Sequence, residues 1–600
     1  MAQTKQQHGL ARKGLELVRW RLPLLPVLIF LGAAFVYPVV MLLSLSFTGD
    51  GGELTLEHYA QLRESFVVGR VLAITFEIAG WTALISILVA YPVAYLLSTV
   101  GKNQRNFLVI WVLMPFWTSF LVRTFAWIVL LGRHGAINQF VAALGLPEPP
   151  SMLYNFTGVM VGMVHALMPL CVLTMLSVME NIDRNLSHAA ATLGARPAQS
   201  FLRVFLPLSL PGVAAGGLLV FITALGFFIT PALLGSERET VIVQLIIFQI
   251  KDLLNWSFAG AISVMLLVVA LVIFVIYDRL VGLSTLSGGA MRVETYGLRN
   301  PIGWLGRRLG ALAVEAAGFV CDVIARLVER LYPPRPERRS KPVGRKLLWL
   351  AVLLVLAFLA GPAFFVIPVS FTEGSFLGWP PEGFSVQWYR AVFENPLWIE
   401  AAIRSFAVAL LAGAAGLLLG VPAAFYIVRR ARRKTVLIGF LVSPIIMPNI
   451  IIAVALFYLF AGIGLVGTTL GLAIGHSVLA VPYVVVTVIA VLKQYDDRLD
   501  HAAFTLGADK LRTFRYVTLP LIRSGLIAAF MFAFVISFDE LTIALFIAGG
   551  QVTTLPRQMW DNALLQVSPT LAAVAAMVLV SMTCVILFSE YLRRRGERLK

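Results

Sequence analysis

The sequence predicts an all-α membrane protein with twelve transmembrane helices, arranged as two pseudo-symmetric six-helix halves. Three observations lead to this fold class: an apolar composition, twelve apolar windows of spanning length, and a segment that occurs twice. Of the 600 residues, 59% are hydrophobic and 13% are charged, and the mean hydropathy is +0.87. A soluble globular domain carries about 25% charged residues. The composition therefore excludes a water-soluble protein and indicates that lipid is the main solvent.

Twelve windows contain the roughly 20 apolar residues that a spanning helix requires. They are residues 23–47, 71–99, 107–132, 157–180, 208–235, 258–280, 347–371, 402–428, 435–462, 466–491, 521–548 and 569–590. With the N-terminus placed in the cytoplasm, the cytoplasmic segments hold 39 of the 48 Lys and Arg residues. The outer loop 48–70 instead carries four acidic residues and two Arg. This positive-inside pattern explains the net charge of +17 by contact with membrane lipid, without nucleic acid.

The windows divide the chain into five segments. These are a cytoplasmic N-terminal segment (1–22), a first six-helix half (23–280), a cytoplasmic linker (281–346), a second six-helix half (347–592) and a basic cytoplasmic tail (593–600). Helical spacing of apolar residues in the linker predicts an amphipathic helix on the inner leaflet. A thirteenth span is disfavoured by its charged residues, which are Glu315, Asp322, Arg326, Glu329 and Arg330. The first apolar window is too long for a cleavable signal peptide.

One cytoplasmic segment occurs twice at an offset of 313 residues. Residues 183–207 (DRNLSHAAATLGARPAQSFLRVFLP) align without a gap with residues 496–520 (DDRLDHAAFTLGADKLRTFRYVTLP). Both copies follow the fourth span of their half. The two halves should therefore have the same orientation and be related by a pseudo-twofold axis along the membrane normal.

Each copy predicts an elbow of two short helices joined at a glycine. Gly194 and Gly507 suit the left-handed conformation that ends a helix. Pro207 and Pro520 are expected to stop the second helix where the next span begins. A single elbow of this kind is adequately explained as surface structure. Two elbows in equivalent places, on a chain with no other cytoplasmic domain, indicate a docking site for a paired partner.

At these residues the chain resembles the permease subunits of binding-protein-dependent ABC importers, whose loop signature is Glu-Ala-Ala, three residues, Gly, then an apolar stretch ending in Leu-Pro. Both copies have His in place of Glu. The resemblance implies the type I importer permease fold, two copies of a cytoplasmic ABC ATPase that receive these loops, and a periplasmic solute-binding protein. The candidate coupling residues are His188, Ala189, Ala190, Gly194 and Pro207 in the first copy, and His501, Ala502, Ala503, Gly507 and Pro520 in the second.

The chain contains no G-x-x-x-x-G-K-[ST] phosphate loop, no paired catalytic acids and no metal-ligand cluster. Its three cysteines, Cys171, Cys321 and Cys584, are too widely spaced to indicate a disulfide framework or a metal site. We therefore predict that the chain is not an enzyme and carries no cofactor. Under the resemblance, ATP and Mg are bound by the partner ATPase subunits.

Charged residues inside spans are costly, so they are candidates for a solute path. Asp539 and Glu540 lie within the eleventh window and would attract a cationic solute, although a structural pair bonded to neighbouring spans is the alternative. Arg123 in the third window is either their partner or a residue that reaches the outer interface. Trp117 could bind a cation by its ring face, or belong to an interfacial aromatic belt. These four residues are the candidate substrate path.

Three stretches resemble spermidine/putrescine permeases in particular: LVRTFAWIVLLGRHGAINQ (121–139), PLCVLTMLSVMENID (169–183) and SFDELTIALFIAGG (537–550). The resemblance implies import of a polyamine-like cation through the inner membrane of a bacterium, with both termini cytoplasmic. The 313-residue offset places Gly226 and Phe227 opposite Asp539 and Glu540, so the first half offers no matching acid. Ferric iron, a phosphonate or an amino acid derivative remain alternative solutes.

Two other classes of transport protein fit part of the pattern. A gradient-driven secondary transporter also has six-plus-six topology, but it has no reason to display matching elbows after its fourth and tenth spans. A channel is disfavoured because no selectivity-filter loop is visible. The elbows therefore favour an importer powered by an external ATPase.

Overall fold

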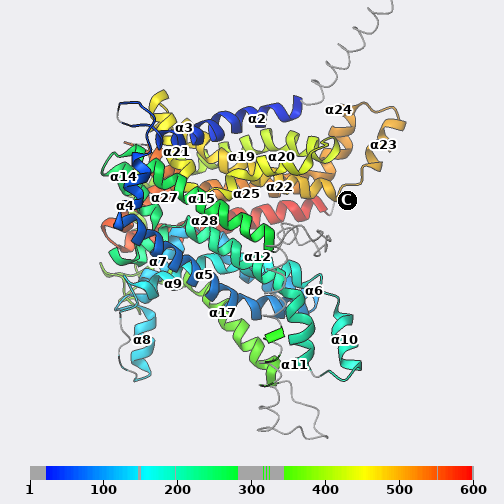
Figure 1. The fold of residues 1–600 in the computed structure, drawn as a ribbon. Coiled ribbons are helices and arrows are strands. Elements are labelled where there is room, and N and C mark those ends of the chain that lie inside the picture. Colours follow the sequence, from blue (N-terminus) through cyan, green and yellow to red (C-terminus); the bar gives the residue numbers. More distant parts are fainter. Residues whose placement is uncertain are drawn as a thin grey trace, which may run out of the picture.

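The computed structural model describes residues 22–49, 51–145, 147, 151–195, 197–280, 343–550 and 552–597, with four further residues of the linker, 315, 316, 319 and 323. In this part of the chain the regular elements are helices, and extended pairing is limited to isolated bridges such as Thr48–Leu54. The helices run alongside one another between two ends of the molecule (Figure 1). This arrangement satisfies the backbone polar groups within each segment, as lipid requires.

The first half consists of the following elements: η1 (Leu22–Leu24), α2 (Leu25–Leu31), η2 (Gly32–Val36), α3 (Tyr37–Leu45), α4 (Glu57–Glu64), α5 (Phe66–Thr99), α6 (Lys102–Leu113), η3 (Met114–Trp117), α7 (Phe120–Leu131), α8 (Ala136–Ala143), α9 (Phe156–Met179), α10 (Arg184–Thr192), α11 (Pro197–Ser200), η4 (Phe201–Phe205), α12 (Leu206–Leu225), α13 (Ile229–Leu234), η5 (Glu237–Glu239), α14 (Ile242–Lys251) and α15 (Trp256–Leu280).

The second half consists of α17 (Val343–Val369), α18 (Gln387–Glu394), α19 (Pro396–Arg429), α20 (Lys434–Ile446), α21 (Asn449–Ile463), α22 (Thr469–Lys493), α23 (Arg498–Thr505), α24 (Lys510–Thr513), η7 (Phe514–Thr518), α25 (Leu519–Phe538), α26 (Thr542–Ile547), α27 (Leu555–Leu565) and α28 (Pro569–Glu597). The four described linker residues are helical. The rest of the predicted linker helix and the N-terminal segment lie outside the described residues.

Ten helices in the described part of the chain are long and apolar enough to cross a membrane. The α20–α21 pair would make an eleventh span, bent by 88° at its break. The twelfth window lies in α28, whose described apolar part, Pro569–Val585, is shorter. All twelve windows therefore contain helix, and ten to eleven of them meet the length and composition of a span.

Four windows predicted as continuous spans are interrupted. The third window is interrupted between η3 and α7, and the ninth between α20 and α21. The fifth and eleventh are interrupted after α12 and after α25. The prediction of continuous helices was wrong at these places because an apolar window reports burial in lipid or protein. A helix can break within such a window, because neighbouring helices can supply hydrogen-bond partners for the backbone groups that the break leaves free.

The two halves share a core of the same construction. In the first half α5, α9 and α12 pack together, and in the second half α19, α22 and α25 do so. Glycines at equivalent places permit the close approach: a Cβ at Gly212 would lie 2.9 Å from the Cβ of Val178, and one at Gly525 would lie 2.4 Å from Cγ2 of Val491. Both distances are too short for a side chain, so the fourth and fifth spans of each half meet through glycine.

The two halves also contact each other through a pair of equivalent helix packings. Helix α3 of the first half packs against α21 of the second, and α17 of the second half packs against α7 of the first. The first span of each half thus lies on the third span of the other. Near the ends of these helices the backbone N–H of Trp379 donates to the carbonyl of His134 at 2.9 Å, which joins loops of the two halves.

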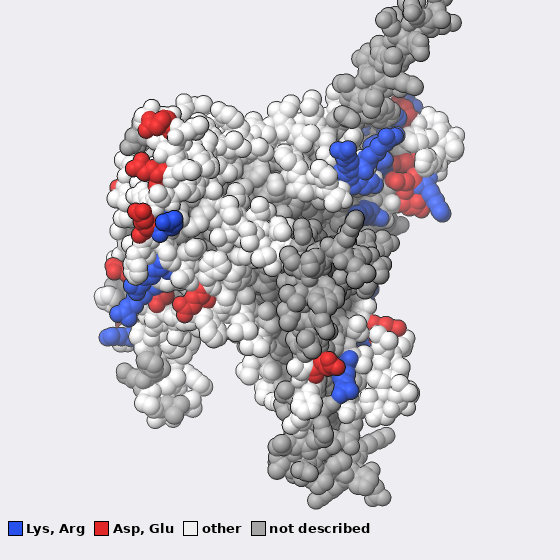
Figure 2. Space-filling view, in the orientation of Figure 1, with Lys and Arg blue, Asp and Glu red and all other residues white. Residues whose placement is uncertain are grey.

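Charged side chains gather at the two ends of the visible surface, and the described band between them is largely uncharged (Figure 2). We call the end that carries α10 and α23 the elbow face, and the end that carries α4, α8 and α14 the opposite face (right and left in Figure 1). An uncharged band between two charged ends is the distribution expected for a protein that crosses a bilayer.

Candidate functional site

The first elbow consists of α10 and α11. The carboxylate of Asp183 caps α10 by accepting the backbone N–H of Asn185 at 2.9 Å. The chain then turns at Gly194, whose φ of +85° is the left-handed conformation predicted for it. Helix α11 begins at Pro197, and proline suits the first turn of a helix.

The second elbow repeats this construction in α23 and α24. Gly507 has a φ of +83°. The carboxylate of Asp509 caps α24 by accepting the backbone N–H of Arg512 at 2.7 Å. Helices α10 and α23 lie at the same end of the molecule and well apart from each other (Figure 1). The repeated segment therefore forms two separate elbows on one face.

The exposed tips of the elbows differ from the residues that the signature emphasises. His188, Ala189, His501 and Ala502 are exposed, Ala190 is half-buried, and Ala503 is buried in the chain itself. The most exposed apolar side chains are Leu193 and Leu506, at 89% and 87%. Each precedes the turning glycine. The sequence contained both leucines in equivalent places, but an apolar pattern alone did not separate them from core residues.

Pro207 and Pro520 do not stop the second helix of the elbow, so this prediction was wrong. The helix continues through a π-turn, η4 in the first half and η7 in the second, into α12 and α25. The N–H of Leu206 bonds to the carbonyl of Phe201, and that of Leu519 bonds to Phe514. The wider turn accommodates the ring that each proline would otherwise drive into the preceding turn.

A polar network that the sequence analysis missed fastens the second elbow to α19. Oδ2 of Asp500 lies 2.6 Å from Nη2 of Arg429. Its Oδ1 accepts the hydroxyl of Tyr495 at 2.6 Å and that of Thr518 at 2.8 Å. Burial opposes the charged carboxylate, but these hydrogen bonds and the Arg429 charge outweigh it and hold the pKa of Asp500 below its usual range. Burial and the bond to Asp500 raise the pKa of Tyr495 to about 12.

Asp539 lies at the break between α25 and α26 and not within a continuous span as predicted. Its carboxylate oxygens accept the backbone N–H of Phe120 at 3.2 and 3.3 Å. Phe120 is the first residue of α7, at the break of the third span in the other half. A carboxylate at a helix N-terminus is favoured by the free amides and by the helix dipole. Asp539 therefore joins a broken helix of one half to a broken helix of the other.

Glu540 has a local role at the same break. Its carboxylate accepts the backbone N–H of Ile543 at 2.8 Å and of Ala544 at 3.4 Å, which caps α26. It also lies 3.8 Å from Nε2 of His476. Glu540 is buried, whereas Asp539 is only partly buried. Of the two acids, Asp539 is the more exposed.

Arg123 lies one turn into α7, close to Asp539. Its guanidinium attracts the Asp539 carboxylate, and its Cζ stands 4.1 Å from the centre of the Phe120 ring. The side chain is buried, so it does not reach an interface as the alternative interpretation required. Trp117 ends η3, and its side chain lies outside the described residues.

The equivalent break in the first half is built without charge. Gly226 follows α12 at the place of Asp539, and a Cβ added there would lie 3.2 Å from Cβ of Pro448. Pro448 directly precedes α21, as Ser119 precedes α7. Each fifth-span break therefore meets the third-span break of the other half, once through a carboxylate and once through close packing.

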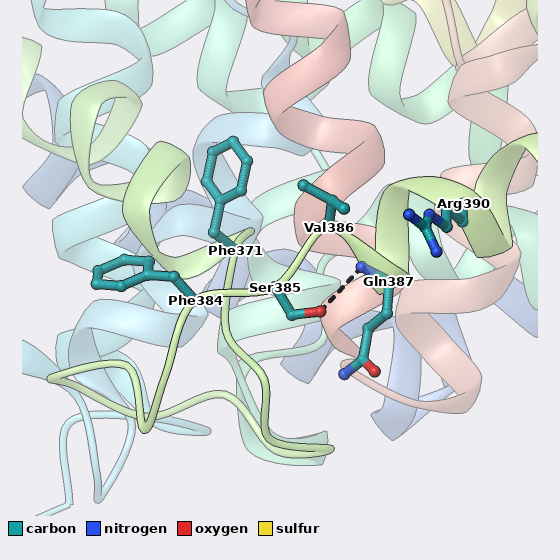
Figure 3. A pocket seen from close by; sticks show the side chains of 6 residues that line it. All are labelled: Phe371, Phe384, Ser385, Val386, Gln387 and Arg390. Atoms are coloured by element: carbon teal, nitrogen blue, oxygen red, sulfur yellow. Dashed lines mark hydrogen bonds between the residues drawn. The ribbon is translucent and has the colours of Figure 1, made fainter.

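A shallow hollow of about 410 Å³ lies in the loop that follows α17 and in the start of α18 (Figure 3). Phe371, Phe384 and Val386 contribute apolar surface, and Gln387 and Arg390 contribute polar groups. The backbone N–H of Gln387 donates to the hydroxyl of Ser385 at 3.1 Å. Among the described residues, no group of three or more His, Cys, Asp or Glu side chains is placed to hold a metal ion.

One family model matches the chain twice. It describes the "binding-protein-dependent transport system inner membrane component" and matches residues 90–284 and 416–598, more than half of the chain. The chain belongs to this family of transport permeases. Each match contains one elbow and the break after its fifth span. The prediction of a fused, two-half ABC importer permease is confirmed.

Individual relatives correspond to one half each in length. The "Spermidine/putrescine transport system permease protein PotB" of Haemophilus influenzae is 34% identical over 248 residues, which is 40% of this chain and 86% of the relative. The PotC protein of the same system and organism is 29% identical over 41% of this chain and 96% of the relative. The "Putrescine transport system permease protein PotI" of Escherichia coli is 30% identical over 42% of this chain and 92% of the relative.

Family membership settles the class of the protein at a coarse level. This permease is a multi-pass component of an inner membrane and a transport subunit by family. The predicted assignment of the coupling residues and of the substrate path is untested by these similarities and remains a prediction.

Proposed function

We propose that this permease is the membrane-spanning subunit of an importer that is driven by two copies of a cytoplasmic ABC ATPase and supplied by a periplasmic solute-binding protein. The observation that carries the proposal is the pair of exposed elbows on one face. Each presents an apolar tip, Leu193 or Leu506, beside a left-handed glycine. Two equivalent tips on one face fit two copies of one partner.

The elbow face is the cytoplasmic face in this proposal. The positive-inside distribution of Lys and Arg supports it, because the segments next to the elbows are rich in cationic residues. ATP and Mg are bound by the ATPase subunits, and both termini of the permease lie in the cytoplasm. The elbows then receive the movement of the ATPases.

The opposite face receives the solute-binding protein. The hollow lined by Phe371, Phe384 and Arg390 is a suitable contact because it combines the exposed ring of Phe384 and the half-buried ring of Phe371 with a cationic rim (Figure 3). Aromatic and arginine side chains are enriched where proteins bind one another. Solute released there enters between the two halves.

The solute is a small organic cation of the polyamine class. Three relatives that each match 40–42% of the chain carry spermidine or putrescine in their names. The partly exposed carboxylate of Asp539 lies between the halves, where an alternating-access permease holds its solute. A cation is the solute that such a partly exposed acid favours.

The partner is tested by extracting the tagged permease from its native membrane and measuring what co-purifies. We expect an ABC ATPase at two copies per permease, and loss of this ATPase in the double variant Leu193→Asp/Leu506→Asp. Leu565→Asp is the matched control, because Leu565 is also 87% exposed but lies in α27. Uptake of putrescine by vesicles that contain the permease without any ATPase would refute the proposal.

A further inference from the structure

Arg123 is an unusual residue to find buried in a membrane-spanning helix. Its exposed fraction is 3%, and neither Nε nor Nη1 has a hydrogen-bond partner among the described residues. A buried cation of this kind is costly unless an anion compensates it. The ring of Phe120, 4.1 Å from its Cζ, compensates it only in part.

Asp539 is the anion that faces Arg123. Its carboxylate is held at the first residue of α7 by the N–H of Phe120, and Arg123 projects from the next turn of the same helix. The two groups attract each other, but no Arg123–Asp539 pair within 4.0 Å occurs in the described structure. Asp539 thus keeps a compensating charge nearby without a direct ion pair.

The next turn of α7 carries a second polar environment. Nε2 of His165 lies 3.1 Å from the carbonyl of Leu359, so this nitrogen carries the proton in a neutral ring. Nδ1 is then an acceptor, and it has no partner among the described groups. The ring of Trp127, one helical turn beyond Arg123, lies 5.5 Å from that of His165. Helix α7 therefore has an acid at its first residue and a neutral acceptor packed against the turn that follows Arg123.

From this geometry we propose that Arg123 is a tethered counter-cation for Asp539, which a transported cation has to displace. The inference rests on the proposed import of a small organic cation. With the path empty, the guanidinium compensates the carboxylate. An arriving cation takes over that role, and Arg123 turns toward His165.

This arrangement selects solutes by charge. A neutral solute leaves the Arg123–Asp539 attraction intact and gains nothing from the carboxylate. A transported cation takes the place of Arg123 as the charge that compensates Asp539, so the exchange costs little free energy. The first half has Gly226 in place of a second acid, so one acid faces one tethered cation.

The test measures binding of radiolabelled putrescine to the purified importer complex in lipid nanodiscs without ATP. Arg123→Gln removes the competing charge, so we expect the half-saturating concentration to fall about tenfold. Arg123→Lys keeps the charge, so its half-saturating concentration should stay within about twofold of the wild-type value. Arg404→Gln is the matched control, since Arg404 is a half-buried arginine of α19 whose Nη1 donates to the carbonyl of Thr553. Asp539→Asn should abolish binding.

Unchanged or weaker binding by Arg123→Gln, with binding retained by the wild type, overturns the inference and leaves the proposed function standing. Absence of putrescine binding and uptake by the wild-type complex overturns the polyamine assignment together with the inference. If Arg123→Gln fails to fold, Arg123→Gln/Asp539→Asn decides the matter. Recovery of folding supports the charge pairing, and failure to recover overturns it.

Discussion

The two halves of this permease have the same plan but are fastened by different chemistry. The first elbow has Ser187 where the second has Asp500, and it is fastened through the guanidinium of Arg184, which donates to the backbone carbonyl of Ser98 in α5. The second elbow is fixed by a carboxylate bonded to Arg429, Tyr495 and Thr518. The fifth-span breaks differ as well, since the break is neutral in the first half and charged in the second. Duplication has preserved the shape of the elbows and breaks while their fastening has diverged.

The largest expected effect tests the feature that the halves share. Gly507→Val and Gly194→Val each place a β-branched residue at a φ above +80°, a conformation that costs such a residue about 1–3 kcal/mol. Both variants should fold but lose ATP-driven uptake, because the elbow tip can no longer keep its shape. Vesicle uptake and size-exclusion chromatography measure the two properties.

Gly439→Val is the control for those two glycines, since Gly439 also has open space around it but lies within helix α20 at an ordinary φ. Its uptake should match the wild type. Full uptake by either elbow variant would argue that the left-handed turn is dispensable and that the two elbows matter only as surface structure.

An intermediate effect should separate the halves. Asp500→Ala leaves the hydroxyls of Tyr495 and Thr518 without their acceptor and removes the shorter of two ion pairs of Arg429, which also contacts Asp497 at 3.2 Å. We expect a cost of about 1–3 kcal/mol of folding free energy. The matched change in the first elbow, Ser187→Ala, should stay within about 0.5 kcal/mol. Thermal denaturation of the purified permease at pH 7 compares them. Equal destabilisation would show that the network does not distinguish the elbows.

The smallest effect is a pH dependence confined to the second elbow. The pKa of Tyr495 is about 12 in the folded permease, against an ordinary value of 10.0. A raised folded pKa gives stability that is complete below 10.0 and is lost as the pH rises toward 12. The stability that wild type has over Tyr495→Phe should therefore be constant from pH 7 to 9 and shrink above 10.0. A constant difference throughout that range would contradict the assigned hydrogen bond.

The fold was largely predictable because lipid imposes a simple rule on sequence. All twelve apolar windows contain helix, as predicted, and the 313-residue repeat predicted the two halves. The glycine turns and the caps at Asp183 and Asp509 were also predictable, since each depends on residues within a few positions in the chain.

The site was less predictable because its contacts are distant in sequence. Asp539 bonds to Phe120 across 419 residues, and Arg429 bonds to Asp500 across 71. Neither pair has a local signature. The helix breaks were missed for a related reason: the residues around Gly226 and Asp539 are as apolar as a continuous span, and only their partners in the other half permit the interruption.

The π-turns after the elbows have a mechanical consequence. Because η7 does not interrupt the helix, residues 510–538 form one unbroken rod, about 44 Å long at the usual helical rise. One end of this helix lies at the molecular surface. The other end lies next to Asp539, whose carboxylate bonds to Phe120 of the other half. A force along the helix axis meets no flexible joint, so it acts on the hydrogen bonds between Asp539 and Phe120.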